Sequence, residues 1–198
     1  MRKLFFMTIV WILTSGFTII GYEGSCKGKV IDADTGDPIE GVVVLAVWNK
    51  IYPNAAGHTT KFYDAREAVT DKNGEFEIPG IGLKILSLLD DPSVTIFKAG
   101  YMYDSLFWEP GYLPYQPFEW KMKWEGEKAI IPLKKLTMEE RRKQNTPDFY
   151  IGERYDEKEN ITHSCLPKNI KLLPGEVNKE LLEQGRKPYD LEGGLCEK

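Results

Sequence analysis

Only two histidines, His58 and His163, are available for metal or acid–base chemistry in this chain of 198 residues. Zinc sites combine His, Cys or carboxylate ligands at workable spacing, and neither histidine begins a His-x-x-Glu pattern. His163 lies two residues before Cys165, but we interpret it as a polar residue beside a disulfide rather than as a metal ligand. His58 is interpreted as a solvated loop residue. We therefore predict no metal ligand, no cofactor and no catalytic residue.

Acidic residues gather at several predicted turns. Asp32 and Asp34 stand at the first turn, Asp71 begins a hairpin, and the run Asp90-Asp91-Pro92 precedes a strand. Aspartate side chains accept hydrogen bonds from the backbone of turns. We therefore interpret these carboxylates as turn residues rather than as a calcium site or an acid–base pair.

Aromatic residues are the one group whose density indicates a ligand. Nine of the chain's 24 aromatic residues fall within residues 101–124, where prolines and a glycine mark most of the stretch as loop. Exposed apolar patches mark contact sites, and exposed rings on the rim of a β-sandwich suit stacking on sugars. Trp108, Tyr112 and Tyr115 are the candidate ligand-binding residues, because one turn would present all three together.

The alternative for this aromatic insertion, residues 101–119, is a lid that folds back and fills a satellite core, since aromatic side chains bury large areas. The exposure of its rings separates the two interpretations. Trp120 and Trp124 alternate with lysines at a period of two, so both are expected on the core-facing side of a strand.

The elements that must hold these residues are extended runs separated by turn signals. Asn73-Gly74 between two such runs predicts a hairpin, because both residues tolerate positive φ. Residues 49–61 contain proline, asparagine and glycine and are predicted to form a loop. Seven short strands with turns between them predict an all-β fold, a small antiparallel β-sandwich. The predicted strands are 29–32, 42–48, 65–70, 75–78, 94–98, 120–124 and 129–133.

Three segments in order, residues 28–44, 68–76 and 94–101, resemble a carboxypeptidase regulatory-like domain. The resemblance rests on the turn Gly36-Asp37-Pro38, on Gly41 before the apolar strand, and on the Asn73-Gly74 hairpin. It implies a transthyretin-like β-sandwich over residues 26–136. It reaches only the accessory domain of such enzymes, and the catalytic domain is absent from this chain. It therefore implies no hydrolase activity, and a hydrolase accessory protein is a distant alternative.

Residues 137–198 follow a different pattern and are predicted to be a partly helical extension. Thr137-Met138-Glu139-Glu140 is a capping box that predicts a short helix through Lys143. An irregular, charged arm is expected next, followed by a second helix over Glu176–Gln184 that Gly185 ends. We expect this extension to wrap the sandwich or to reach a partner.

The N-terminus predicts export. Arg2 and Lys3 precede a charge-free stretch from Leu4 to Ile20, which is typical of a secretory signal peptide cleaved after residue 21. Retention as an N-terminal membrane anchor is the second interpretation, and lipidation of Cys26 is the third. All three place the rest of the chain outside the cytoplasm, in the periplasm or at the cell surface, with the membrane contacted only through this segment.

The three cysteines fit an oxidising compartment. One arrangement joins Cys165 to Cys196 and leaves Cys26 lipidated or free. A second arrangement has Cys26 tie the N-terminus to the C-terminal region, and the third leaves three unpaired thiols. We predict the Cys165–Cys196 bridge.

Charge excludes one class of function. Residues 1–21 hold two of the 26 basic residues and none of the 30 acidic ones, so the remainder carries a formal charge of about −6. An acidic chain without a basic cluster is not expected to bind nucleic acid. The sequence therefore predicts a non-catalytic extracytoplasmic binding or structural module of the cell envelope, whose partner is a polysaccharide or another envelope protein. The alternative is a carbohydrate-binding protein that uses the aromatic insertion.

Overall fold

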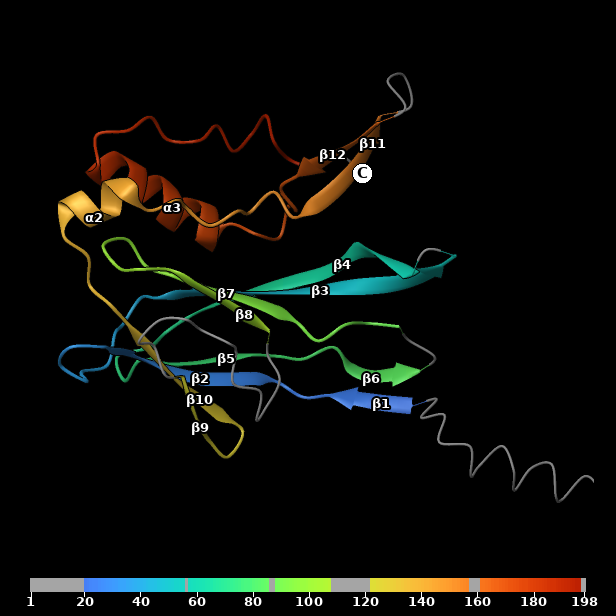
Figure 1. Cartoon of the computed structure of the whole chain (residues 1–198), viewed down its shortest axis with the longest axis horizontal. Helices are drawn as coiled ribbons and strands as arrows, with labels where there is room; N and C mark the ends of the chain where they lie inside the picture. The colour runs from blue at the N-terminus through green and yellow to red at the C-terminus, as the bar shows by residue number, and fades with distance from the viewer. Residues whose placement is uncertain (1–19, 56, 86–87, 108–121, 157–160, 197–198) are drawn as a thin grey trace, which may run out of the picture.

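The computed structural model describes residues 20–55, 57–85, 88–107, 122–156 and 161–196. The four residues Trp108, Tyr112, Tyr115 and Trp120 therefore lie outside the described residues. Figure 1 labels the strands and helices of the described chain. They are β1 (Ile20–Glu23), β2 (Cys26–Asp32), β3 (Val43–Asn54), β4 (Gly57–Val69), β5 (Glu75–Ile78), β6 (Gly82–Ile85), β7 (Ser93–Phe97), β8 (Asp104–Phe107), β9 (Lys123–Glu125), β10 (Lys128–Leu133), α2 (Met138–Lys143), β11 (Gly152–Asp156), β12 (Ile161–Cys165) and α3 (Leu172–Glu183).

Two four-stranded sheets form the sandwich, with strand orders β5-β2-β10-β9 and β4-β3-β7-β8. The all-β fold class is confirmed. Their strands pair antiparallel except for β2 and β10, which run parallel. The core between the sheets is built by residues at alternate positions, because successive side chains of a strand point to opposite faces. Its largest fully buried members include Trp48, Ile78, Ile96 and Ile131.

The first half of strand β3, from Val43 to Trp48, is buried on both faces. Val44, Ala46 and Trp48 face the sandwich core, whereas Val43 and Leu45 belong to a second apolar cluster on the other side. An uninterrupted apolar run is the pattern of a strand covered on two sides, in contrast to the alternation of a half-exposed strand. Residues 42–48 are such a run. The second cluster is completed by the C-terminal residues Phe149, Leu166, Ile170, Leu173, Val177 and Leu181.

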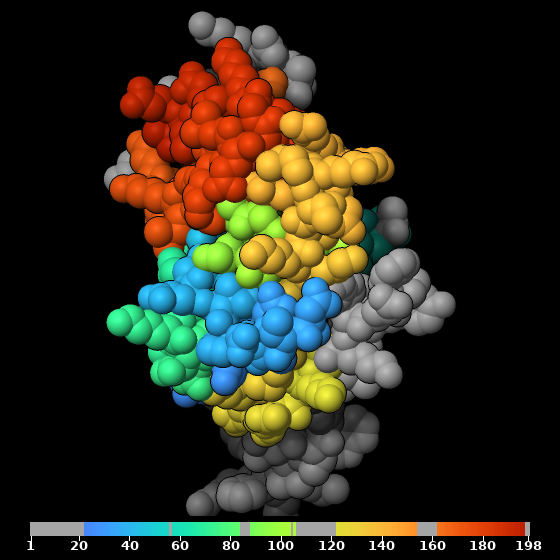
Figure 2. Space-filling view, turned by 90° about the vertical axis from the view of Figure 1, so that its left-hand side faces the viewer, coloured from blue at the N-terminus to red at the C-terminus, as the bar shows by residue number. Residues whose placement is uncertain are grey.

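The C-terminal region forms a third layer over the β4-β3-β7-β8 sheet. It consists of α2, the β11–β12 hairpin and α3, and Figure 2 shows it in orange and red directly on the sandwich. The capping box of α2 is confirmed, since the Thr137 side chain accepts from Glu140 N and the Glu140 carboxylate accepts from Thr137 N. Gly185, at φ 72°, ends α3 as predicted.

Two predictions of irregular structure are wrong. Residues 49–61, expected to be a loop, continue β3 and β4 as a two-stranded ribbon in which Tyr52 lies opposite Thr59. The β-forming residues on both sides of the Asn54–Gly57 tip explain the extension, and Pro53 is tolerated because it lies next to the turn. The charged arm after α2 contains the β11–β12 hairpin. The second helix also begins four residues earlier than predicted, at Leu172.

Candidate functional site

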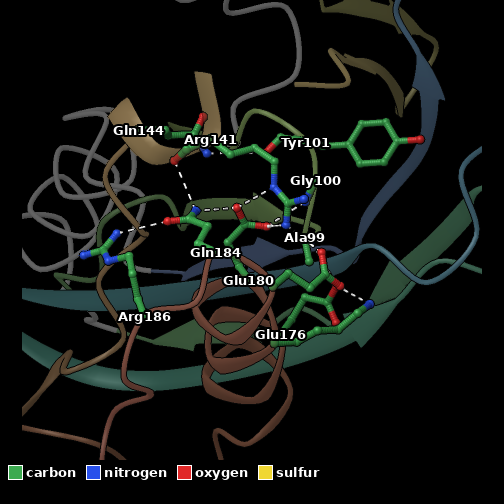
Figure 3. A network of polar contacts seen from close by, with 11 residues as sticks. Ala99, Gly100, Tyr101, Arg141, Gln144, Glu176, Glu180, Gln184 and Arg186 are labelled. Atoms are coloured by element: carbon green, nitrogen blue, oxygen red, sulfur yellow. Dashed lines mark hydrogen bonds and ion pairs between the residues drawn. The ribbon is translucent and has the colours of Figure 1, made fainter. Parts of the chain in front are cut away.

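Two of the three buried polar side chains of the described residues, Glu180 and Gln184, lie where the third layer meets the turn after β7 (Figure 3). The carboxylate of Glu180 on α3 accepts hydrogen bonds from two of the three nitrogens of the Arg141 guanidinium, with Nε 2.8 Å from Oε1 and one terminal nitrogen 2.6 Å from Oε2. The backbone N–H of Gly100 donates to the same carboxylate at 2.7 Å, and Gln184 Nε2 donates at 2.6 Å. One glutamate therefore joins α2, α3 and the sandwich.

The two charged groups of this network keep their protonation states near neutral pH. Burial by itself would raise the pKa of Glu180, but hydrogen bonds from Arg141, Gln184 and the Gly100 N–H outweigh it and hold the pKa below its usual value. The same bond raises the pKa of Arg141 further above its usual range. Both groups are therefore ionised across the neutral range. Such a pair suits a structural clamp, whereas a general acid or base needs a pKa near the working pH.

A second carboxylate, Glu67 on β4, covers the beginning of α3. Its oxygens accept the backbone N–H groups of Lys171, Leu172 and Leu173 at 2.8, 2.9 and 2.7 Å. These are orphan donors of a helix N-terminus, and Lys171 supplies no side-chain cap. The positive end of the helix dipole also favours a carboxylate there. Glu67 therefore fastens the third layer to the edge of the sheet.

Neither clamp was predicted from the sequence. Arg141 and Glu180 lie 39 residues apart, and Glu67 and Leu173 lie 106 residues apart. No local spacing links such partners. The one sequence signal is an acidic repeat on α3, because Glu176 and Glu180 lie four residues apart on one helix face. Glu176 accepts the Ala99 N–H at 3.0 Å.

The third layer is closed at its end by a disulfide between Cys165 and Cys196. Leu166 and Leu195 form a parallel bridge beside it. Gly152 lies under the disulfide, and a Cβ added there would stand 2.5 Å from the Cys196 sulfur. The glycine is therefore required by the close approach of the two sulfur atoms.

Cys26 lies in the sandwich core. It is the first residue of β2 and is buried, and burial together with the nearby Glu23 carboxylate raises the pKa of its thiol to about 12. Attachment of a lipid to this sulfur would require the Cys26 side chain to move out of the core. Lipidation of Cys26 stays a prediction, with this displacement as its structural cost.

The remaining predicted residues have structural surroundings. His58 is exposed on β4, and His163 lies opposite Arg154 in the β11–β12 hairpin. Among the described residues, no group of three His, Cys, Asp or Glu side chains is placed to hold a metal ion. The turn role of Asp32 is confirmed, since its carboxylate accepts the N–H groups of Asp34 and Thr35 at 2.9 and 3.1 Å. Trp124 is half-buried and packs against the sandwich core, as expected.

A groove of about 410 Å³ lies between the β4-β3-β7-β8 sheet and the start of the third layer. Aliphatic side chains, one aromatic ring, several hydroxyl groups, one amide and one carboxylate share its lining. Thr95 lies opposite Ser105 in the β7–β8 register, so both side chains are on one face of the sheet. The lining residues are Leu45, Val47, Asn49, Ser93, Thr95, Tyr103, Ser105, Pro147, Asp148 and Ile151.

Among the described residues, no helix combines the length and apolar composition needed to cross a membrane.

Comparison with known proteins assigns no family. No protein-family model matches the chain, so the resemblance to carboxypeptidase regulatory-like domains is not confirmed. A comparison with curated proteins also finds no match. Among solved structures, the chain is similar to the backbone protein of pilus 2b from group B streptococcus, at 14% identity and a TM-score of 0.31. That similarity covers 57% of this chain and 41% of the pilus protein.

Proposed function

We propose that this chain is a non-catalytic module of the cell envelope, exported and acting through its surfaces. The observation that carries the location is the Cys165–Cys196 disulfide, because cytosolic thiols are kept reduced and disulfides persist in oxidising compartments. The charge-free stretch from Leu4 to Ile20 supports the same location. The partner is another component of the envelope.

The use of the buried polar groups supports a non-catalytic role. Glu180 and Gln184 join α2 to α3, and Thr70 accepts the Val42 N–H at 2.9 Å and donates to the Ile39 carbonyl at 2.6 Å. These groups hold backbone and neighbouring side chains in place. An active site would need titratable groups that converge in a cleft and stay available to a substrate.

Export is tested by mapping the thiols of the full chain recovered from fractionated cells under non-reducing conditions. We expect the chain in the envelope fraction, with one peptide linking Cys165 to Cys196. Cys26 should resist iodoacetamide until the protein is unfolded, because only the thiolate reacts and this thiol is buried. A Cys165→Ser variant is the matched control, because its Cys196 thiol is freed from the disulfide and should react with iodoacetamide in the folded protein. Recovery from the cytosol with free thiols would contradict the proposal, and a lipid mass on Cys26 would contradict its place in the core.

A second candidate function is carbohydrate binding, which the lining of the groove favours. Ligand pockets typically measure about 300–1,000 Å³ and combine apolar walls with a few placed polar groups. The half-exposed ring of Tyr103 suits the C–H face of a sugar, and Ser93 and Thr95 suit its hydroxyls. Among the described residues this groove is the place that offers a sugar such contacts, and the candidates Trp108, Tyr112 and Tyr115 stay a separate prediction.

The second candidate is tested by affinity electrophoresis in gels that contain envelope polysaccharide. The double variant Ser93→Ala and Thr95→Val removes two hydroxyls at nearly constant shape, so we expect it to lose retention while its melting temperature stays close to that of the parent. A Thr35→Val variant, at an exposed turn of the opposite sheet, should be retained like the parent. Unchanged retention of the double variant rejects the groove. Loss of retention in a Trp108→Ala and Tyr112→Ala variant alone would assign binding to the insertion.

A further inference from the structure

Large apolar side chains are exposed at the end of the sandwich where β1 begins. Tyr22 on β1 is 78% exposed and lies directly opposite Leu83 on β6, which is 60% exposed. Leu88, which follows β6, is 50% exposed, and Tyr52 near the tip of the β3–β4 ribbon is 42% exposed. Water-facing apolar side chains that gather at one end of a molecule mark a contact surface.

These side chains come from segments that hydrogen bonds hold together. The Ile51 N–H donates to the Leu88 carbonyl at 2.6 Å, and Lys50 and Leu89 form an isolated bridge. The ribbon is therefore joined to the segment that follows β6, and β6 is paired with β1. Figure 1 shows the tip of the β3–β4 ribbon and the start of β1 at the same end of the molecule, with α2 at the opposite end.

The ribbon adds positive charge to this end. Lys50 and Lys61 lie directly opposite each other in the β3–β4 register, and their ammonium nitrogens stand 5.6 and 5.8 Å from the centre of the Tyr52 ring. Like charges directly opposite in a sheet repel each other, and the ring only partly offsets this repulsion. No described carboxylate forms an ion pair with either lysine. This arrangement suits an anionic partner outside the chain.

We propose that this end, called here the entry face, rests on a membrane surface that contains anionic lipid headgroups. The entry face consists of Tyr22, Lys50, Tyr52, Lys61, Leu83 and Leu88. The proposal rests on the proposed function, since it requires export to the envelope.

The place where the chain enters β1 identifies the membrane as the occupant. Nineteen residues precede Ile20, and the stretch from Leu4 to Ile20 carries no charge. The proposal takes the second interpretation of the N-terminus, in which this stretch is retained as a membrane anchor, so that β1 begins next to the lipid and holds the entry face near it. Tyrosine favours the interface between lipid and water, and lysines near the surface are attracted to anionic headgroups.

Acidic groups at this end limit where the attraction acts. Three carboxylates, those of Glu23, Asp91 and Glu127, line a cleft together with Tyr22. The ribbon, with Lys50 and Lys61, therefore supplies the electrostatic contact, whereas β1 and β6 supply the apolar contact.

Hydroxyl-radical footprinting of the full chain tests this orientation. The chain is reconstituted into vesicles of phosphatidylcholine alone, into vesicles that also contain phosphatidylglycerol, and into micelles of an uncharged detergent. We expect the labelling of Tyr52 and Leu88 to fall several-fold in the anionic vesicles. Leu182 and Tyr189 in the third layer are also exposed and should be labelled equally in all three media. Equal labelling of the entry face in all media overturns the proposal.

A pair of charge reversals tests the role of the lysines. The double variant Lys50→Glu and Lys61→Glu should restore the labelling of Tyr52 in anionic vesicles. The matched variant Lys72→Glu and Arg142→Glu carries the same charge change on exposed residues away from the entry face and should remain protected. Equal protection in neutral and anionic vesicles, or protection by added envelope proteins but not by vesicles, also overturns the proposal. These outcomes concern only the orientation of the chain on the membrane. The thiol mapping tests export separately, so the proposed function would stand.

Discussion

Replacing Val44 by aspartate is expected to prevent folding. Val44 is fully buried on the core-facing side of β3, between its register partners Ala68 on β4 and Ile96 on β7. An unpaired charge at such a position costs several kcal/mol, against a total stability of about 5–15 kcal/mol for a typical domain. Circular dichroism of the purified variant should show no cooperative thermal transition.

Val69→Asp is the matched control for this prediction. Val69 belongs to the neighbouring strand β4 and is exposed, so the same change of side chain there meets water rather than the core. We expect this variant to melt within a few degrees of the parent, since exposed substitutions usually change stability by less than about 0.5 kcal/mol. A Val44→Asp protein that melts like the parent would contradict the position or the facing of β3.

The strands were predictable where local pattern alone determines them. The apolar run at residues 42–48 is long and β-branched, and Asn73-Gly74 allows the positive φ that its turn requires, with Gly74 at φ 73°. The ribbon at 49–61 is not predicted by local pattern, because turn-forming residues such as Pro53 and Gly57 indicate a loop even though the residues around them favour strands. In the fold those residues lie at or next to the tip of the ribbon.

The third layer shows the limit of sequence reasoning more clearly. The same apolar run that predicts β3 also indicates burial on two faces, yet nothing local says what covers the second face. The residues that cover it, such as Phe149 and Leu173, lie more than 100 positions later and are spread among charged neighbours. Pairs such as Arg141 with Glu180 depend on this packing, so no spacing rule could identify them. The aromatic candidates Trp108, Tyr112 and Tyr115 lie outside the described residues, and their role stays a prediction.

Lowering the pH should increase local unfolding of the third layer before the sandwich unfolds. The pKa of Glu180 is lower in the folded protein than in the unfolded chain, so the unfolded state binds its proton first as pH falls. The stability that this carboxylate contributes is therefore fully present above its unfolded value, about 4.3, and is lost as pH falls through the lower folded value. Hydrogen exchange of the α3 amides, followed from neutral pH to pH 3, should report this loss before the amides of β3 exchange.

Removing one partner of the Arg141–Glu180 pair by mutation should lower the free energy of unfolding at neutral pH more than acidification of the unchanged protein does. Breaking a buried ion pair on one side typically costs about 3–5 kcal/mol, because the other charge is left buried without its partner. Glu180→Gln and Arg141→Met should each destabilise α3 strongly in urea unfolding, while the double variant Arg141→Met and Glu180→Leu should recover much of the loss. Glu183→Gln is the matched control, since Glu183 also bonds to Arg141 at 2.6 Å but is exposed. If Glu180→Gln costs no more than Glu183→Gln, the buried glutamate is not what holds the third layer to the sandwich. The apolar cluster around Leu173 and Val177 and the Glu67 contact to α3 must then do so.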